Sequence, residues 1–219
     1  VPLMNVKSLV LAGAAGSLLA GAASAAFVGF NVFEYAVDGN GVDPVLLGTT
    51  TYRVYVVFDN MDDQLTAAGG TPDQPVDIYT VNNGDFYQDA FGSDFAHNAA
   101  FEVAFPSLHY DTYVTIGSVD TGVDGPTGVA GNWNDMTNGT LFQDDAGWFR
   151  NPDDPVTYAG DDYQVLLAQF TVPTGDQIKG WVKFSATVDG TGDTFYEFIP
   201  APGAFALLGL AGLVSRRRR

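Results

Sequence analysis

Between residues 27 and 198 the chain shows no helical periodicity of useful length, and this constrains its fold more than any other feature. Runs of β-branched and aromatic residues alternate there with clusters of Gly, Asp, Asn and Pro, as an all-β domain requires. The acidic residues point the same way, because 23 are Asp and only 3 are Glu. Asp is favoured in turns, where its short side chain bonds nearby backbone amides, whereas Glu favours helices. The sequence therefore predicts an all-β domain, a two-sheet β-sandwich of jelly-roll type.

Eight strands are predicted from these runs, and the clearest is TTYRVYVVF at residues 50–58. The full set covers residues 27–37, 50–58, 76–81, 99–105, 112–116, 163–172, 178–188 and 194–199. Residues 117–158 are rich in Gly, Asn, Asp and Trp and carry little strand signal. They are expected to form either a long surface excursion or a set of short strands.

The first 25 residues are typical of a secretory signal peptide. A short basic start ending at Lys7 precedes an apolar run over residues 9–22. Ala23 and Ala25 then flank a serine in the small-x-small form that signal peptidase cleaves, after Ala25 or Ala26. A buried helix of the domain is the alternative, but the run lacks a polar stripe at helical spacing. We expect an N-terminal signal helix at residues 1–25, followed by the acidic β-domain at 26–198.

Residues 199–219 resemble a membrane-sorting tail in outline. A proline-bracketed tripeptide is followed by a short apolar helix and a terminal arginine cluster. The apolar stretch of about 13 residues reaches roughly 20 Å, against about 30 Å of hydrocarbon, so it holds a bilayer weakly even with snorkelling arginines. Each arginine costs about 2.5–3.5 kcal/mol at the membrane centre, so the cluster should stay cytoplasmic and leave the domain outside. The tail residues are Pro200, Ala201, Pro202, Arg216, Arg217, Arg218 and Arg219.

This tail resembles the PEP-CTERM tail of proteins that exosortases process, over residues 199–219. Ala201 stands where that family usually carries Glu, which leaves open the position of cleavage and the sortase variant. Three segments of the body, residues 84–92, 105–117 and 165–172, are similar to an uncharacterised planctomycete domain found with such tails. The resemblance implies signal peptidase and an exosortase-type enzyme as partners, and a transient inner-membrane anchor. It implies a final location at the cell surface, outer membrane or extracellular matrix. An ordinary C-terminal anchor is the alternative.

The charge of the body excludes some partners. Between residues 27 and 200 there are four basic residues against 26 acidic ones, a balance of −22. Nucleic acid binding depends on clustered Lys and Arg, so no nucleic-acid partner is expected. The chain has no Cys, which excludes disulfides and thiolate chemistry. Adaptation to salty surroundings is one explanation of so negative a charge.

Calcium is a second explanation of the Asp-rich loops, because oxygen ligands at alternate positions suit a hard cation. None of the loops has EF-hand spacing, and for each loop solvated turn residues are the simpler interpretation. No other cofactor is expected. The candidate metal ligands are Asp38, Asn40, Asp43, Asp120, Asp124, Asp153, Asp154, Asp161, Asp162, Asp189 and Asp193.

A catalytic set is not predicted. Ser107, His109 and Asp111 could be drawn as a triad, but alternate strand residues do not reach one another in the needed order, and no G-x-S-x-G elbow is present. Glu34, Glu102 and Glu197 could supply a glycosidase pair, which so many carboxylates would also produce by chance. A secreted hydrolase is the least favoured hypothesis.

Two functional hypotheses are therefore favoured over a secreted hydrolase. The first is a non-enzymatic surface or matrix protein sorted through its tail. The second is a calcium-dependent carbohydrate-binding module, with Trp133 and Trp148 as stacking platforms for an extracellular polysaccharide. Core packing is the alternative role for these two rings.

Overall fold

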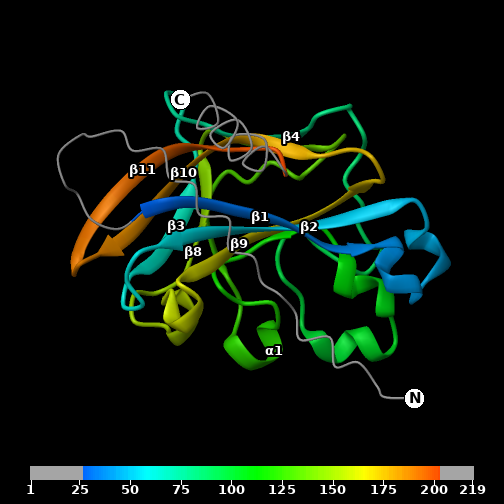
Figure 1. The fold of residues 1–219 in the computed structure, drawn as a ribbon, viewed down its shortest axis with the longest axis horizontal. Helices are drawn as coiled ribbons and strands as arrows, with labels where there is room; N and C mark the ends of the chain where they lie inside the picture. The colour runs from blue at the N-terminus through cyan, green and yellow to red at the C-terminus, as the bar shows by residue number, and fades with distance from the viewer. Residues whose placement is uncertain (1–26, 203–219) are drawn as a thin grey trace, which may run out of the picture. The chain divides into compact units, whose positions relative to one another are not determined.

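The computed structural model describes residues 27–202, so the signal, the cleavage residues and the arginine cluster lie outside the described residues. The described part is mostly β, with two antiparallel sheets in a β-sandwich-like arrangement (Figure 1). This confirms the all-β prediction. Among residues 27–202, no helix is long and apolar enough to span a membrane.

The smaller sheet has four strands in the order β1-β2-β9-β5. The larger has seven, in the order β6-β8-β3-β10-β4-β7, with β11 paired to β10. Strand β10 is central, because β11 lies along one edge while β3 and β4 share the other. The strands are β1 (Phe27–Val37), β2 (Thr49–Phe58), β3 (Gln64–Gly69), β4 (Val76–Thr80), β5 (Tyr113–Val114), β6 (Gly128–Gly131), β7 (Thr140–Gln143), β8 (Ala146–Phe149), β9 (Gln164–Pro173), β10 (Ile178–Val188) and β11 (Thr191–Ile199).

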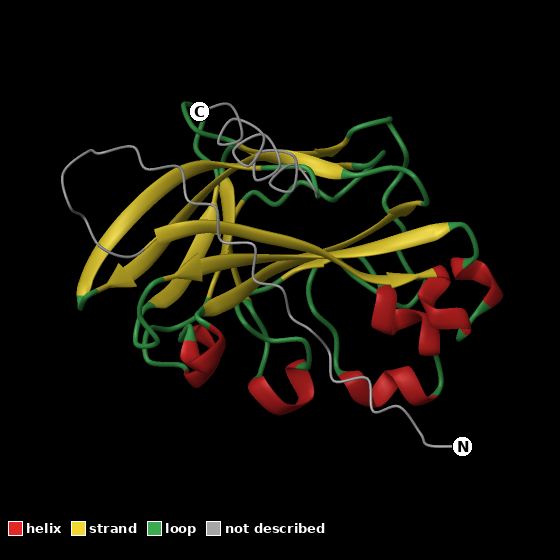
Figure 2. Ribbon diagram, viewed as in Figure 1, coloured by secondary structure: helices red, strands yellow, loops and turns green. Residues whose placement is uncertain are grey.

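Helical turns occupy the connections outside the strands (Figure 2). They are short because their sequences carry caps and prolines but no apolar stripe; three of them have Pro at the first or second position. They are η1 (Asp38–Gly41), η2 (Pro44–Leu46), η3 (Ala99–Val103), η4 (Pro106–Tyr110), α1 (Thr121–Asp124), η5 (Pro155–Thr157) and η6 (Gly160–Asp162).

The main core lies between the inner faces of the two sheets. Val54, Phe170 and Trp148 are among its fully buried members. Strand β9 is buried at eight of its ten positions, which accounts for its nearly continuous apolar run. Its outer face is covered by η4 and the neighbouring loops, and the polar network described below lies there.

One predicted strand is wrong, at residues 99–105. This segment forms η3, because the Asn98 side chain accepts a hydrogen bond from the N–H of Ala100 and Asp120 accepts one from the N–H of Ala99. Its apolar residues are not core: Phe101 is 58% and Val103 90% exposed. Residues 117–158 contain three short strands, β6 to β8, which was one of the two expected outcomes. Strand β3 was not predicted.

Candidate functional site

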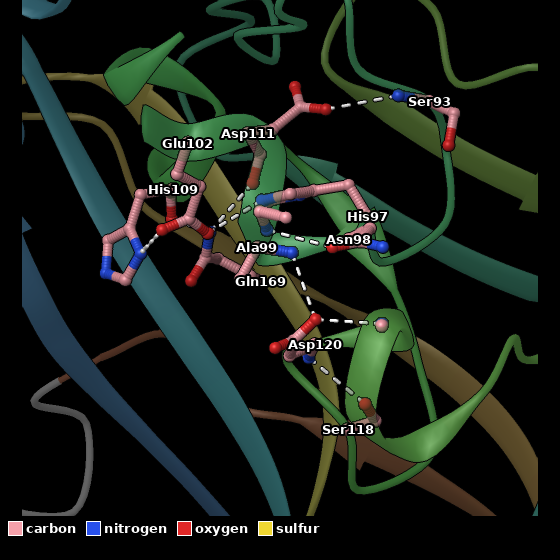
Figure 3. A network of polar contacts seen from close by, with 12 residues as sticks. Ser93, His97, Asn98, Ala99, Glu102, His109, Asp111, Ser118, Asp120 and Gln169 are labelled. Carbon is pink, nitrogen blue, oxygen red and sulfur yellow. Dashed lines mark hydrogen bonds and ion pairs between the residues drawn. The ribbon is translucent and has the colours of Figure 1, made fainter. Parts of the chain in front are cut away.

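Glu102 is the centre of a polar network on the outer side of the four-stranded sheet (Figure 3). Its Oε1 lies 2.8 Å from Nε2 of His97, and its Oε2 lies 2.9 Å from Nδ1 of His109. The remaining nitrogen of His109, Nε2, lies 2.6 Å from the hydroxyl of Tyr35 on β1. An ionised Glu102 therefore accepts N–H bonds from both rings, and Tyr35 donates to His109.

Gln169 on β9 joins this network to the backbone of the covering loop. Its Nε2 donates to the carbonyls of His109 (3.0 Å) and Asp111 (2.9 Å). Its Oε1 accepts from Nε of Arg53 (2.9 Å), whose guanidinium lies 3.6 Å from the centre of the Tyr35 ring. These bonds fix the 97–111 segment against β1, β2 and β9.

Asp111 anchors the neighbouring loop from a fully buried position. Its Oδ1 accepts a hydrogen bond from the N–H of Asp89 (2.7 Å), and its Oδ2 accepts one from the N–H of Ser93 (3.2 Å). Gly92 passes so close that a Cβ atom there would clash with Oδ2, so only glycine fits. Burial raises the pKa of Asp111 to about 7, against the lowering effect of these amides.

The triad drawn from Ser107, His109 and Asp111 is not assembled. Both ring nitrogens of His109 are bonded elsewhere, to Glu102 and Tyr35. The carboxylate of Asp111 binds backbone amides. Glu34, Glu102 and Glu197 lie on β1, η3 and β11, in different parts of the fold. The hydrogen bonds of the Glu102 network join a loop to the four-stranded sheet, which is a structural role.

A second region, on the outer face of the seven-stranded sheet, presents aromatic rings to solvent. Alternation along β10 buries Val182 and Phe184 and turns Lys179, Trp181 and Lys183 outward. We define the aromatic face as the outward aromatic and lysine side chains of four adjacent strands, β11, β10, β4 and β7: Tyr196, Phe198, Lys179, Trp181, Lys183, Tyr79 and Phe142. One carboxylate, that of Asp77, lies among them, paired with Trp181 and with Phe142.

The rings of the aromatic face are arranged by strand register. Trp181 is paired with Phe198 on β11, and their ring centres are 5.3 Å apart. Trp181 also stacks on Tyr196 at 5.2 Å with an interplanar angle of 22°. Trp181 is 42%, Phe198 40% and Phe142 43% exposed. Large rings held this far out of the core are available to a ligand.

Charge and shape add to this face. Of the four basic residues in the described part, Arg53 is engaged with Gln169 and Arg150 is 5% exposed. The other two, Lys179 and Lys183, flank Trp181. Beside Lys183 lies a groove of about 340 Å³ whose floor consists of small residues, among them Ala67, Gly69, Ala130 and Gly147.

The two tryptophans predicted as sugar platforms occupy other positions. Trp148 is fully buried and its Nε1 donates to the carbonyl of Thr115 (3.0 Å), so its ring cannot stack on a sugar. Trp133 is partly buried, packs edge-on against Trp148, and donates from Nε1 to Asp94 (2.8 Å). For Trp148 the carbohydrate prediction is wrong, and core packing is its role.

Most predicted metal ligands bind nearby backbone or side-chain groups. Asp38, Asp43 and Asp154 accept from the N–H of Gly48, Val45 and Val156. Asp120 accepts from Ala99 and Gly122, and these two bonds lower its pKa.

The other predicted ligands that form hydrogen bonds bind side-chain groups. Asp124 accepts from Ser118, Asp153 from Tyr158, and Asp154 pairs with Arg150. Asn40 donates to Tyr110. Asp189, in the β10–β11 turn, accepts from Nδ2 of Asn60 at 3.4 Å. Asp161 and Asp162 lie in η6, and Asp193 lies on β11.

Within residues 27–202, no group of three or more His, Cys, Asp or Glu side chains is arranged to hold a metal ion. No protein-family model, curated protein or solved structure matches this chain. The function of the chain is therefore inferred from its own residues.

Proposed function

We propose that this chain is a non-enzymatic, exported surface or extracellular-matrix protein whose β-sandwich, of jelly-roll type, binds polysaccharide across the aromatic face. The observation that carries the proposal is Trp181, which is 42% exposed at the centre of a regular sheet and stacked beside Tyr196. A ring placed there gains little for folding, so its exposure is better explained by a ligand.

Sugar rings suit this surface chemically. A pyranose has a face of C–H groups whose partial positive charge meets the negative face of an aromatic ring. Tryptophan and tyrosine side chains provide large contact areas at low cost in conformational entropy. The rings lie in a row across adjacent strands of one sheet, and a row of contacts suits an extended chain of sugars better than it suits a single small molecule.

The lysines indicate which polysaccharide is preferred. The described domain carries many carboxylates, yet its two lysines both lie on the aromatic face. Lys179 lies 5.5 Å from the centre of the Tyr79 ring, which leaves its ammonium beside the strip of rings. A polysaccharide bearing carboxylate groups would pair with these ammonium groups locally, although Asp77 on the same face and the rest of the domain would repel it. We therefore propose an acidic polysaccharide.

Replacing Trp181 with Ala should weaken binding of a uronate-containing polysaccharide by about 30-fold, because truncating a central aromatic contact costs about 2 kcal/mol. Lys179→Ala with Lys183→Ala should weaken binding of the uronate polymer and leave a neutral polymer unaffected. Affinity electrophoresis against a panel of neutral and acidic polysaccharides measures both effects.

The matched control is Phe101→Ala, which removes an exposed ring from η3, outside the aromatic face. It should bind as the wild type does. If Trp181→Ala and wild type migrate alike on every polymer of the panel, the aromatic face is not a glycan site.

We also propose that the chain reaches the surface through its two ends, by signal peptidase and an exosortase-type enzyme, with a transient C-terminal membrane anchor. The support is the pairing of an N-terminal signal pattern with a terminal arginine cluster. Changing Arg216 to Arg219 together to Ser should shift the protein between membrane, surface and medium fractions. Identical fractionation and identical mass of the mature protein would remove the tail from the proposal.

A further inference from the structure

The turn between β2 and β3 contains Asp63, whose side chain is buried. Asp63 as a whole is 1% exposed. Oδ1 accepts a hydrogen bond from the backbone N–H of Asp189 (3.0 Å), in the turn between β10 and β11. Oδ2 is buried and has no hydrogen-bond partner among the described residues. A buried carboxylate oxygen without a partner is costly, so this position needs an explanation.

The backbone of Asp63 is held on both sides. Its N–H donates to the carbonyl of Asn60 (3.3 Å), and its own carbonyl accepts from the N–H of Ala159 (2.8 Å). The turn as a whole is fixed by a further bond from the N–H of Gly160 to the carbonyl of Met61 (2.9 Å). Turns after β2, before β9 and after β10 therefore meet around this carboxylate.

Several acidic side chains lie near Asp63, and no basic side chain is paired with them in the described residues. Burial, followed by the charges of Asp189 and Asp59, raises the pKa of Asp63. Asp161 and Asp162 are on the adjoining η6. Within residues 27–202 the ion pairs join Glu102 to two histidines and Arg150 to Asp154, so none of them neutralises these acids.

We propose that Asp63 and Asp189 bind one Ca²⁺ ion between the β2–β3 and β10–β11 turns. The unpartnered oxygen of Asp63 supplies one ligand, and the carboxylate of Asp189, whose Oδ1 accepts a long hydrogen bond from Nδ2 of Asn60 (3.4 Å), supplies another. Backbone carbonyls and water complete the six to eight oxygens that calcium takes. A site with two carboxylates is consistent with the lack of any larger group of acidic or histidine side chains in the described part.

Calcium fits these turns better than other metals do. The ligands are oxygens only, and the chain has no Cys. Calcium tolerates irregular geometry, whereas magnesium demands an octahedron and zinc favours nitrogen and sulfur. The ion would join two turns 126 residues apart in the sequence, as the hydrogen bond from Asp189 to Asp63 already does. This site is independent of the aromatic face.

Calcium titration of the purified protein, after chelation, tests the site by calorimetry and thermal unfolding. The expected result is one equivalent of bound Ca²⁺ per chain and a rise in Tm of several degrees. Asp63→Asn should abolish both effects. Asp189→Asn should lower the affinity at least tenfold, and it keeps a residue type that tolerates the positive φ of 47° at this position.

Asp193→Asn is the matched control, since it removes one charge from the same hairpin and should retain the calcium response. Sodium chloride at equal ionic strength should not reproduce the rise in Tm. No heat and no shift in the wild type would overturn the proposal, as would an equal calcium response in Asp63→Asn, which indicates screening of the net charge. Stabilisation by acid that Asp63→Asn loses, without a calcium response in the wild type, would assign a proton to Asp63 instead.

Discussion

Trp148→Ala should lower the free energy of unfolding by about 3–5 kcal/mol, the range for removing a large aromatic side chain from a core. Trp148 lies on β8 and is fully buried. Its ring packs edge-on against Trp133, with centres 6.1 Å apart, and its Nε1 donates to the carbonyl of Thr115. The substitution therefore opens a cavity and leaves a buried carbonyl without its donor. Denaturant unfolding measures the loss.

The control is the same substitution at an exposed tryptophan, Trp181→Ala. Its ring contacts Tyr196 and Phe198 on the surface, so we expect a loss of about 1 kcal/mol. The two variants should then have different phenotypes: Trp148→Ala loses much of its stability, and Trp181→Ala loses little stability but binds polysaccharide about 30-fold more weakly. Equal losses of stability in the two variants would contradict the core placement of Trp148.

Much of the fold could be predicted from alternation and turn residues. The strands predicted at residues 27–37, 50–58, 163–172 and 178–188 correspond to β1, β2, β9 and β10. The pattern is clearest in β2 and β10, where buried and outward residues alternate, and in β9, which is almost continuously buried. Strand β3 reads QLTAAG, with few β-branched residues, and it forms because β10 and β8 pair with both of its edges. Pairing with distant strands cannot be predicted from the local sequence alone.

The error at residues 99–105 has a local cause that is visible only in three dimensions. Ala99 to Val103 reads as apolar, but Asp120, 21 residues further on, accepts the hydrogen bond from Ala99 and fixes the start of η3. Short helical turns depend on such caps more than on apolar pattern.

The site residues differ in whether the sequence predicts them. Trp181 could have been identified, because Lys179 and Lys183 share its phase on a strand while Val182 and Phe184 have the opposite phase. Asp63 could not, since its burial results from Asp189 and Ala159, both distant in the sequence. The Glu102 network likewise joins β1, η3 and η4 only after folding.

Asp111 should make the stability of the protein fall as pH rises through neutrality. Burial raises its pKa from 3.8 to about 7 on folding. Between these two values the folded protein keeps a proton that the unfolded chain has released, so folding takes up a proton. The resulting stabilisation is fully present below about pH 4 and is lost as the pH rises through about 7.

The expected loss is about 2–3 kcal/mol between about pH 5 and pH 8.5, since one pKa unit corresponds to about 1.4 kcal/mol. Asp111→Asn cannot ionise, and its amide offers one acceptor for the two N–H groups of Asp89 and Ser93, so we expect it to be less stable at low pH. The wild type and Asp111→Asn are distinguished by how steeply the free energy of unfolding changes with pH. All other ionisable groups are the same in both proteins, so subtracting one pH profile of unfolding from the other isolates Asp111. Parallel profiles would mean that the Asp111 carboxylate ionises at its ordinary pH in the folded protein, and that the amides of the 89–93 loop outweigh its burial.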